Sequence, residues 1–136
     1  MSLETDLPLV ILPDRLAVCR LAADALFPDW ARPGYLLALV RTPDELSVVC
    51  EERLVPPEVK AERGWRAFQV QGPLDFSLVG VLAALLTPLG MAGVSVFALS
   101  TFETDYILVK ENSLERAIQA LVQAGFLVLK DVRLSS

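Results

Sequence analysis

The pattern of apolar and polar positions is clearest in the second half of the chain. Residues 65–71 alternate with a period of two, which predicts a strand. An amphipathic helix is predicted from an apolar stripe that consists of Leu114, Ala117, Ile118, Leu121 and Val122. The run after Ser77 is almost wholly apolar, so we expect a helix that is covered on more than one side. In order, the predicted elements are strand 65–71, helix 76–91, strands 94–99 and 106–110, a helix from 114, and strand 126–132.

Polar and glycine residues mark the ends of the predicted helices. Asp75 or Ser77 can accept hydrogen bonds from the free amides of the first helix. Asn112 with Glu115 three positions later resembles a capping box for the second helix. Gly93 suits the left-handed conformation that ends many helices. These positions therefore fix where we expect each helix to begin and end.

This order of elements predicts an α+β fold of the ferredoxin-like βαββαβ type, a sandwich of one antiparallel sheet with two helices on one face. The first half of the chain repeats the order more weakly, with a short helix expected at 22–27 and a linker or short helix at 56–63. We therefore predict two tandem modules, a degenerate one at 1–64 and a complete one at 65–136.

One strand is claimed by both predicted modules. Residues 65–71 would close the first module and open the second, so we expect shared or exchanged strands. The short apolar strand at 7–12 is a candidate to fill the gap. The apolar surface of the first predicted helix must also be buried by the other module or by a second copy of the chain. This predicts a tandem arrangement or a homodimer.

The composition of the chain disfavours several classes of function and of binding site. The chain has 136 residues, a formal net charge of -5 and no histidine. The negative charge opposes nucleic-acid binding, which rests on lysine and arginine contacts to phosphate. The missing histidine removes the commonest general base and most imidazole metal sites, so we expect no cofactor and no metal. Cys19 and Cys50 lie in apolar runs, which indicates buried small side chains and not a disulfide framework.

The location that the sequence predicts is cytoplasmic. Residues 1–7 carry Glu4 and Asp6 and no basic stretch, which is unlike a signal peptide. The longest apolar stretch, 78–92, is too short to span a bilayer and is interrupted at Thr87 and Pro88. We therefore expect no membrane association.

Polar groups that could bind a small ligand occur at the start of the first predicted helix and in the hairpin between strands 94–99 and 106–110. Unpaired amides at the helix start can bind a carboxylate. Asp75, Glu103 or Asp105 can bind an ammonium or guanidinium group. Roles without a ligand stay open for the same residues: Asp75 can be a helix cap only, the hairpin carboxylates can be solvated charges, and Phe102 can be an interface anchor.

Several short segments resemble the ACT domain family. They are the stretch from Asp75 to Gly80, the turn Ala92–Val96, the hairpin entry Leu99–Thr101 and the strand Asp105–Val109. The closest similarity is to ACT_7-type modules, such as those in the regulatory region of aspartokinases and in the cytosolic arginine sensor. It covers about residues 65–126, and residues 1–60 match only as a degenerate second module.

The resemblance implies a regulatory domain that binds an amino acid between paired domains. It places the ligand at the start of the first helix and at the end of the second strand. Carried over residue by residue, the ligand-binding positions are Asp75, Phe76, Ser77, Leu78, Ser100, Thr101, Phe102, Thr104 and Asp105.

We weigh three functions. The favoured one is a non-catalytic sensor or regulatory module for an amino acid or a similar metabolite, and the alternative is a ligand-free dimerisation or protein-interaction module. An enzyme is disfavoured, because Asp75 and Asp105 are the only convergent carboxylate pair and nothing supplies a nucleophile with its base.

Overall fold

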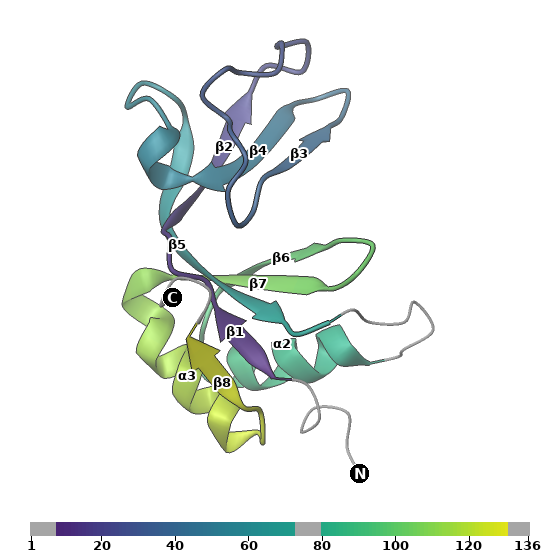
Figure 1. Ribbon diagram of the computed structural model, residues 1–136, viewed down its shortest axis with the longest axis vertical. Coiled ribbons are helices and arrows are strands. Elements are labelled where there is room, and N and C mark those ends of the chain that lie inside the picture. Colours follow the sequence, from purple (N-terminus) through teal and green to yellow (C-terminus); the bar gives the residue numbers. More distant parts are fainter. Residues whose placement is uncertain (1–7, 73–79, 131–136) are drawn as a thin grey trace. The chain divides into compact units, whose positions relative to one another are not determined.

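The computed structural model describes residues 8–72 and 80–130 (Figure 1). Its contacts divide the chain into two compact units. We call residues 14–65 the N-terminal unit, and residues 1–13 together with 66–136 the C-terminal unit. The predicted boundary between residues 64 and 65 stays a prediction, but the contacts group the first 13 residues with the second half of the chain.

The C-terminal unit is a sheet covered by two helices, which confirms the α+β prediction. The sheet has the strand order β8-β1-β5-β7-β6. Figure 1 shows α2 and α3 beside each other on this unit. The elements are β1 (Leu9–Ile11), β5 (Ala61–Val70), α2 (Val81–Met91), β6 (Val96–Ser100), β7 (Asp105–Lys110), a 3₁₀ turn (Glu111–Ser113), α3 (Leu114–Gln123) and β8 (Val128–Lys130).

One apolar core joins these helices to their sheet. On α2 the buried side chains are Val81, Leu85 and Leu89, which lie four residues apart on one stripe. On α3 they are Ala117 and Leu121. The rest of the core comes from the strands and from the turns at the helix ends: Leu9, Ile11, Phe68, Val70, Val94, Ile107, Val109 and Phe126.

The helix α2 is buried less completely than its sequence predicts. Leu82 and Leu86 are only partly buried, and the side chain of Met91 is 86% exposed. Cover on a second side of this helix therefore stays a prediction.

The strand β1 fills the gap that the sequence left open. It pairs antiparallel with β5, where Leu9 lies opposite Val70 and Ile11 opposite Phe68. It also pairs with β8, and this pairing is parallel, whereas β2–β4, β3–β4 and β6–β7 are antiparallel pairs. The first half of β5 pairs instead with β2, so one ten-residue strand serves both units.

The N-terminal unit is an antiparallel sheet with the strand order β3-β4-β2-β5. Its elements are β2 (Leu16–Leu21), β3 (Ala38–Arg41), β4 (Leu46–Glu51), a 3₁₀ turn (Glu52–Leu54) and the first half of β5. Both cysteines are free and buried in its core, as predicted. The core consists of Ala17, Cys19, Ala31, Leu46, Val48, Cys50 and Val55.

The helix expected at 22–27 is wrong. Residues 14–65 are all described and contain no α-helix. The segment is a loop, because the guanidinium of Arg41 donates hydrogen bonds to the carbonyls of Ala23 and Ala25. Six residues are also too few to stabilise a helix without tertiary support. The segment 56–63 is likewise not a helix, since β5 already begins at Ala61, where it pairs with β2.

Both predicted helix starts need correction. The helix α2 begins at Val81, with Gly80 at its N-cap in a left-handed conformation (φ 84°), and the predicted caps Asp75 and Ser77 lie outside the described residues. The capping box at Asn112 is not formed, because a 3₁₀ turn leads directly into α3 and no side chain caps that helix. Gly93 has the positive φ that was expected of it.

Candidate functional site

The hairpin between β6 and β7 has a loop closed by its own polar groups. The amide of Thr101 donates to the carbonyl of Thr104 at 2.8 Å. The hydroxyl of Thr101 accepts from the amides of Glu103 and Thr104 at 3.3 and 3.2 Å. Phe102 is thereby held at the tip with a side chain that is 78% exposed. The Thr101 hydroxyl therefore closes the loop itself.

A carboxylate stands at the base of this loop. Ser100 and Asp105 are opposite each other in the β6–β7 register, and the Ser100 hydroxyl donates to Asp105 Oδ1 at 2.6 Å. The half-buried Asp105 side chain is thus oriented by a hydrogen bond. Oδ2 accepts no hydrogen bond from the residues that the structure describes. One oxygen of Asp105 is therefore available to a cationic group.

Thr104 joins the hairpin to the end of β5. Its side chain is buried, and its hydroxyl donates to the carbonyl of Val70 at 2.7 Å. Val70 is the last residue of β5. The base of the hairpin loop therefore lies beside the point where the chain leaves β5 towards α2, although the Thr104 hydroxyl itself is already used.

The remaining predicted site residues, Asp75, Phe76, Ser77 and Leu78, lie outside the described residues. The nearest described position on the α2 side is Gly80, and no side-chain hydrogen bond caps the helix that follows it. Among the described residues, the first-turn amides of α2 therefore have no side-chain acceptor. The structure brings together Ser100, Thr104 and Asp105 at one end of the hairpin, with Phe102 at the tip.

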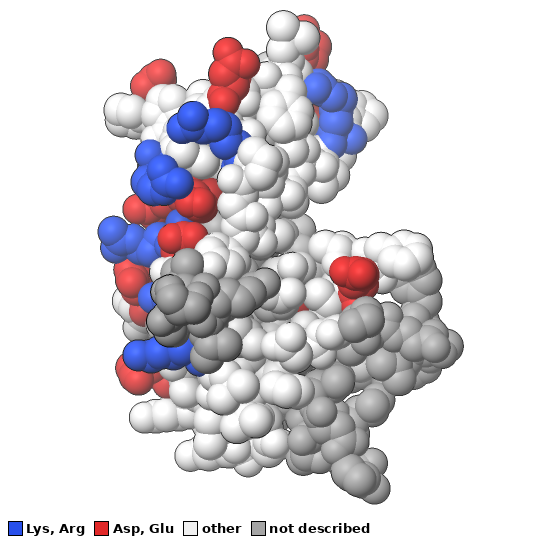
Figure 2. Space-filling view, in the orientation of Figure 1, with Lys and Arg blue, Asp and Glu red and all other residues white. Residues whose placement is uncertain are grey.

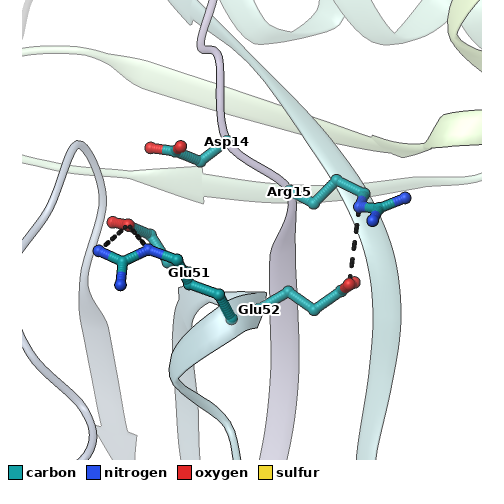
Figure 3. Close-up of a pocket in the computed structure, with 5 residues that line it drawn as sticks. Asp14, Arg15, Glu51 and Glu52 are labelled. Atoms are coloured by element: carbon teal, nitrogen blue, oxygen red, sulfur yellow. Dashed lines mark hydrogen bonds and ion pairs between the residues drawn. The ribbon is translucent and has the colours of Figure 1, made fainter.

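A second cluster of polar side chains lies in the N-terminal unit, where sequence reasoning selected nothing. It surrounds a pocket of about 170 Å³ (Figure 3). The pocket is lined by Asp14, Arg15, Glu51, Glu52 and Arg53. The local sequence signal is charge, a Glu-Glu-Arg run that begins at the last residue of β4 and an Asp-Arg pair that precedes β2. Such runs are usually solvated, so the sequence did not identify this pocket.

The residues that line the pocket form two ion pairs. Arg53 contacts a single oxygen of Glu51, with Nε and Nη2 at 3.2 and 3.1 Å from Oε1. Arg15 Nε lies 3.6 Å from Glu52 Oε2, while Glu52 Oε1 accepts from the amide of Gly64 at 2.7 Å. The pairs differ in burial, since the Glu51 side chain is 8% exposed and that of Glu52 is 24% exposed.

Other chemistry is limited in the described residues. The neighbouring Cys19 thiol and burial raise the pKa of the Cys50 thiol, which donates to the carbonyl of Glu51 at 3.6 Å. Residues 8–72 and 80–130 hold no group of three potential metal ligands. No helix in these ranges is long and apolar enough to cross a bilayer. Acidic and basic side chains are mixed on the face in Figure 2, where the described residues form no continuous basic surface.

Comparison with known proteins gives matches to both parts of the chain. A family model described as an ACT domain matches residues 60–123. A second model, described as an N-terminal domain, matches residues 14–58. The cytosolic arginine sensor for mTORC1 subunit 1, from human and from cattle, is 36% identical over 58 residues. These residues are 42% of this chain but only 18% of the sensor, so the match spans a small part of that relative.

Solved structures extend the similarity to nearly the whole chain. Protein Atu0741 from Agrobacterium tumefaciens is 36% identical, with a TM-score of 0.86 over 92% of this chain and 93% of that one. The regulatory subunit of aspartate kinase from Thermus thermophilus has a TM-score of 0.53 at 13% identity, covering 88% of this chain and 95% of that one. At this identity the second likeness concerns the fold alone.

Proposed function

We propose, because this chain belongs to the ACT domain family, that it is a non-catalytic regulatory module that binds an amino acid or a similar small metabolite. ACT domains and the regulatory subunits that share this fold support an amino-acid-sensing role in general. The observation that carries the proposal is the half-buried Asp105 carboxylate, which Ser100 orients while Oδ2 is left without a partner among the described residues.

The proposed ligand is held by opposite charges at its two ends. Asp105 would accept hydrogen bonds from its ammonium or guanidinium group, because charge-assisted hydrogen bonds are the stronger ones. The free amides at the start of α2 would receive its carboxylate. Thr104, through its bond to Val70, keeps the hairpin beside the chain segment that leads to α2. We place the ligand at a junction with the other module or with a second copy, and include Asp75, Phe76, Ser77 and Leu78 in the site.

The alternative is a ligand-free dimerisation module, and one observation favours it. The strand β8 pairs only with β1 among the described strands, and Leu129 in this strand and Leu127 just before it are 42% and 56% exposed. An open sheet edge with exposed leucines is suited to pairing with another chain. Under either function we propose a homodimer. We further propose a cytoplasmic location, which the name of the arginine sensor supports.

A thermal-shift panel of the twenty amino acids separates the two functions. A ligand at one hundred times its dissociation constant should stabilise the fold by about 2.7 kcal/mol, which raises the midpoint by several degrees. The sensor function predicts such a rise with one or a few amino acids. If no amino acid moves the midpoint, while the chain is dimeric in sedimentation, the interaction module is the correct function.

A matched pair of variants tests the role of Asp105. Asp105→Asn keeps an acceptor for the Ser100 hydroxyl but loses the charge, so we expect the ligand-induced shift to disappear while the far-UV circular dichroism is kept. Glu103→Gln removes one charge from the exposed loop of the same hairpin and should leave the shift unchanged. Asp75→Ala should also abolish the shift. Equal shifts in all variants would exclude a ligand held by these carboxylates.

A further inference from the structure

Two cysteines are diagonal neighbours in the core of the N-terminal unit. In the register of β2 and β4, Cys19 lies opposite Val48 and Cys50 lies opposite Ala17. Cys50 is therefore two residues along β4 from the partner of Cys19, and side chains two residues apart on a strand point to the same face. Both thiols belong to one apolar cluster, where Cys19 is 1% and Cys50 is 0% exposed. The central strands of this sheet thus hold two thiols against each other.

The two thiols differ in how readily they ionise. The neighbouring Cys50 thiol lowers the pKa of Cys19, and the positive charge of Arg63 lowers it as well, against the opposing effect of burial. Cys50 donates a hydrogen bond to the carbonyl of Glu51 at 3.6 Å, and its pKa is raised by Cys19 and by burial. The thiolate is the nucleophilic form of cysteine. Cys19 is therefore the member of the pair that more readily becomes a nucleophile.

The spacing across the strands suits a reversible bond better than a permanent one. Diagonal neighbours in an antiparallel pair have Cα atoms roughly 7–8 Å apart, whereas a relaxed disulfide holds its Cα atoms at roughly 4.4–6.8 Å. A bond between Cys19 and Cys50 therefore draws β2 and β4 together and stores strain, which makes the bond easier to reduce. Both cysteines are free in this structure.

We propose that Cys19 and Cys50 form a redox switch, which a hydroperoxide oxidises to an intramolecular disulfide. The Cys19 thiolate attacks the outer oxygen of the hydroperoxide, and the O–O bond breaks. The alcohol or water that leaves takes up the proton that Cys19 released, and Cys19 becomes a sulfenic acid. The Cys50 sulfur then attacks the Cys19 sulfur, and the sulfenic hydroxyl leaves as water with the Cys50 proton. The two thiols together lose two electrons, which the hydroperoxide gains.

The disulfide closes a loop of the chain between β2 and β4. This loop contains β3 and the segment around Leu26 and Phe27, two large apolar residues that are 88% and 56% exposed. Oxidation therefore restricts the part of this unit that presents them to solvent. The switch does not depend on the amino-acid site proposed at the hairpin, because both cysteines belong to the N-terminal unit and Asp105 to the C-terminal unit. A failure of one proposal leaves the other standing.

Peroxide treatment of the reduced full chain tests the bond itself. Because both thiols are buried, we expect the oxidant to reach them through local opening of the strands. Mass spectrometry after alkylation of the remaining thiols should show both cysteines lost together, in a linked peptide pair that dithiothreitol separates. The yield should not depend on protein concentration. Peptide mapping distinguishes this link from oxidation of Met91, which is 86% exposed.

A reference thiol sets the dose of hydrogen peroxide. Asp24→Cys, at an exposed position of the same unit and in a background of Cys19→Ala and Cys50→Ala, provides that thiol. At a dose that fully oxidises it, two native cysteines that still react with the alkylating agent would overturn the proposal. Disulfides that join two chains in place of Cys19 and Cys50 would also overturn it.

Single variants test the order of the steps. Cys50→Ala should leave Cys19 as a sulfenic acid that dimedone traps, because no second thiol resolves it. Cys19→Ala should give no dimedone adduct above the level of the double variant. Equal adducts in the two single variants would overturn the assignment of Cys19 as the attacking thiol.

Hydrogen exchange tests whether the bond acts as a switch. Amides between residues 20 and 49 should exchange more slowly in the oxidised than in the reduced wild-type chain, while those of α3 should not change. The double variant Cys19→Ala/Cys50→Ala, treated with the same peroxide, is the control and should show no slowing. A disulfide that forms without slowing exchange in this segment would show that the pair is not a switch.

Discussion

The two units of this chain differ in where their polar groups find partners. In the C-terminal unit the hairpin hydroxyls are used internally: Ser100 bonds Asp105, Thr101 closes the loop, and Thr104 bonds Val70. In the N-terminal unit Glu51 is buried, yet one of its oxygens has no partner in the described chain. Each unit thus has one carboxylate oxygen, Oδ2 of Asp105 and Oε2 of Glu51, that accepts no hydrogen bond from the described residues, and the two carboxylates differ in burial, since Asp105 is half-buried and Glu51 is buried.

The units also differ in how their cores are built. Helices α2 and α3 pack on the C-terminal sheet through regularly spaced apolar stripes. The N-terminal sheet has no α-helix to cover it, and loop residues such as Ala31 and Val55 take part in its core instead. A core that is completed by loops depends on contacts between distant residues, so its structure is harder to foresee and easier to disturb locally.

The largest effect is expected from identical substitutions in the two cores. Leu85→Ala on α2 and Leu46→Ala on β4 each remove a side chain that is 1% exposed, and each should cost about 2–5 kcal/mol in urea unfolding. Leu129→Ala, at a 42% exposed position, is the control and should cost much less.

Hydrogen exchange then sharpens the comparison. Leu46→Ala should lower the protection of strands β2 and β4 while α3 keeps its protection, because each unit has its own core. A uniform loss of protection in both units would mean that they unfold as one cooperative body, contrary to this expectation.

A smaller effect is expected at the hairpin. Thr104→Val keeps the shape of the side chain but leaves the carbonyl of Val70 without its buried donor, which should cost about 1–3 kcal/mol. Thr87→Val, an exposed position on α2, is the matched control and should be nearly neutral. The same variant should weaken any amino-acid-induced thermal shift, because the hairpin loses its attachment to β5. An unchanged free energy of unfolding would show that this hydrogen bond adds nothing to the structure.

Local patterns predicted the parts of the fold that are decided locally. The left-handed Gly93 follows from backbone sterics and was found. The stripe of α3 follows from spacing and was found except at its end, because Ala117 and Leu121 are buried whereas Val122 is 52% exposed. The loop at 22–27 was mistaken for a helix because its conformation depends on Arg41, far along the chain. The strand β5 was predicted too short because its first residues are extended through pairing with β2.

The residues of the candidate sites likewise differ in whether the local sequence predicts them or only the fold brings them together. Ser100 and Asp105 could be predicted, because hairpin geometry brings them opposite each other. Glu51 could not, because its burial and its close approach to Gly34, where a Cβ atom would stand 2.6 Å from Glu51 Oε2, have no local sequence signal. A Glu-Glu-Arg run is typical of a solvated surface, and only the fold separates the buried first carboxylate from the more exposed second.

The smallest effect concerns the two ion pairs of the N-terminal pocket and tests that separation directly. Arg15→Gln removes a partly exposed pair with Glu52, whose other oxygen still accepts from Gly64, so the cost should be about 0–1 kcal/mol and should shrink in high salt. Arg53→Gln removes the partner of a more buried carboxylate and should cost more than Arg15→Gln. Urea unfolding at low and high salt measures both. If the two variants are equally stable, the burial of Glu51 carries no energetic consequence, and the contrast between the two carboxylates fails.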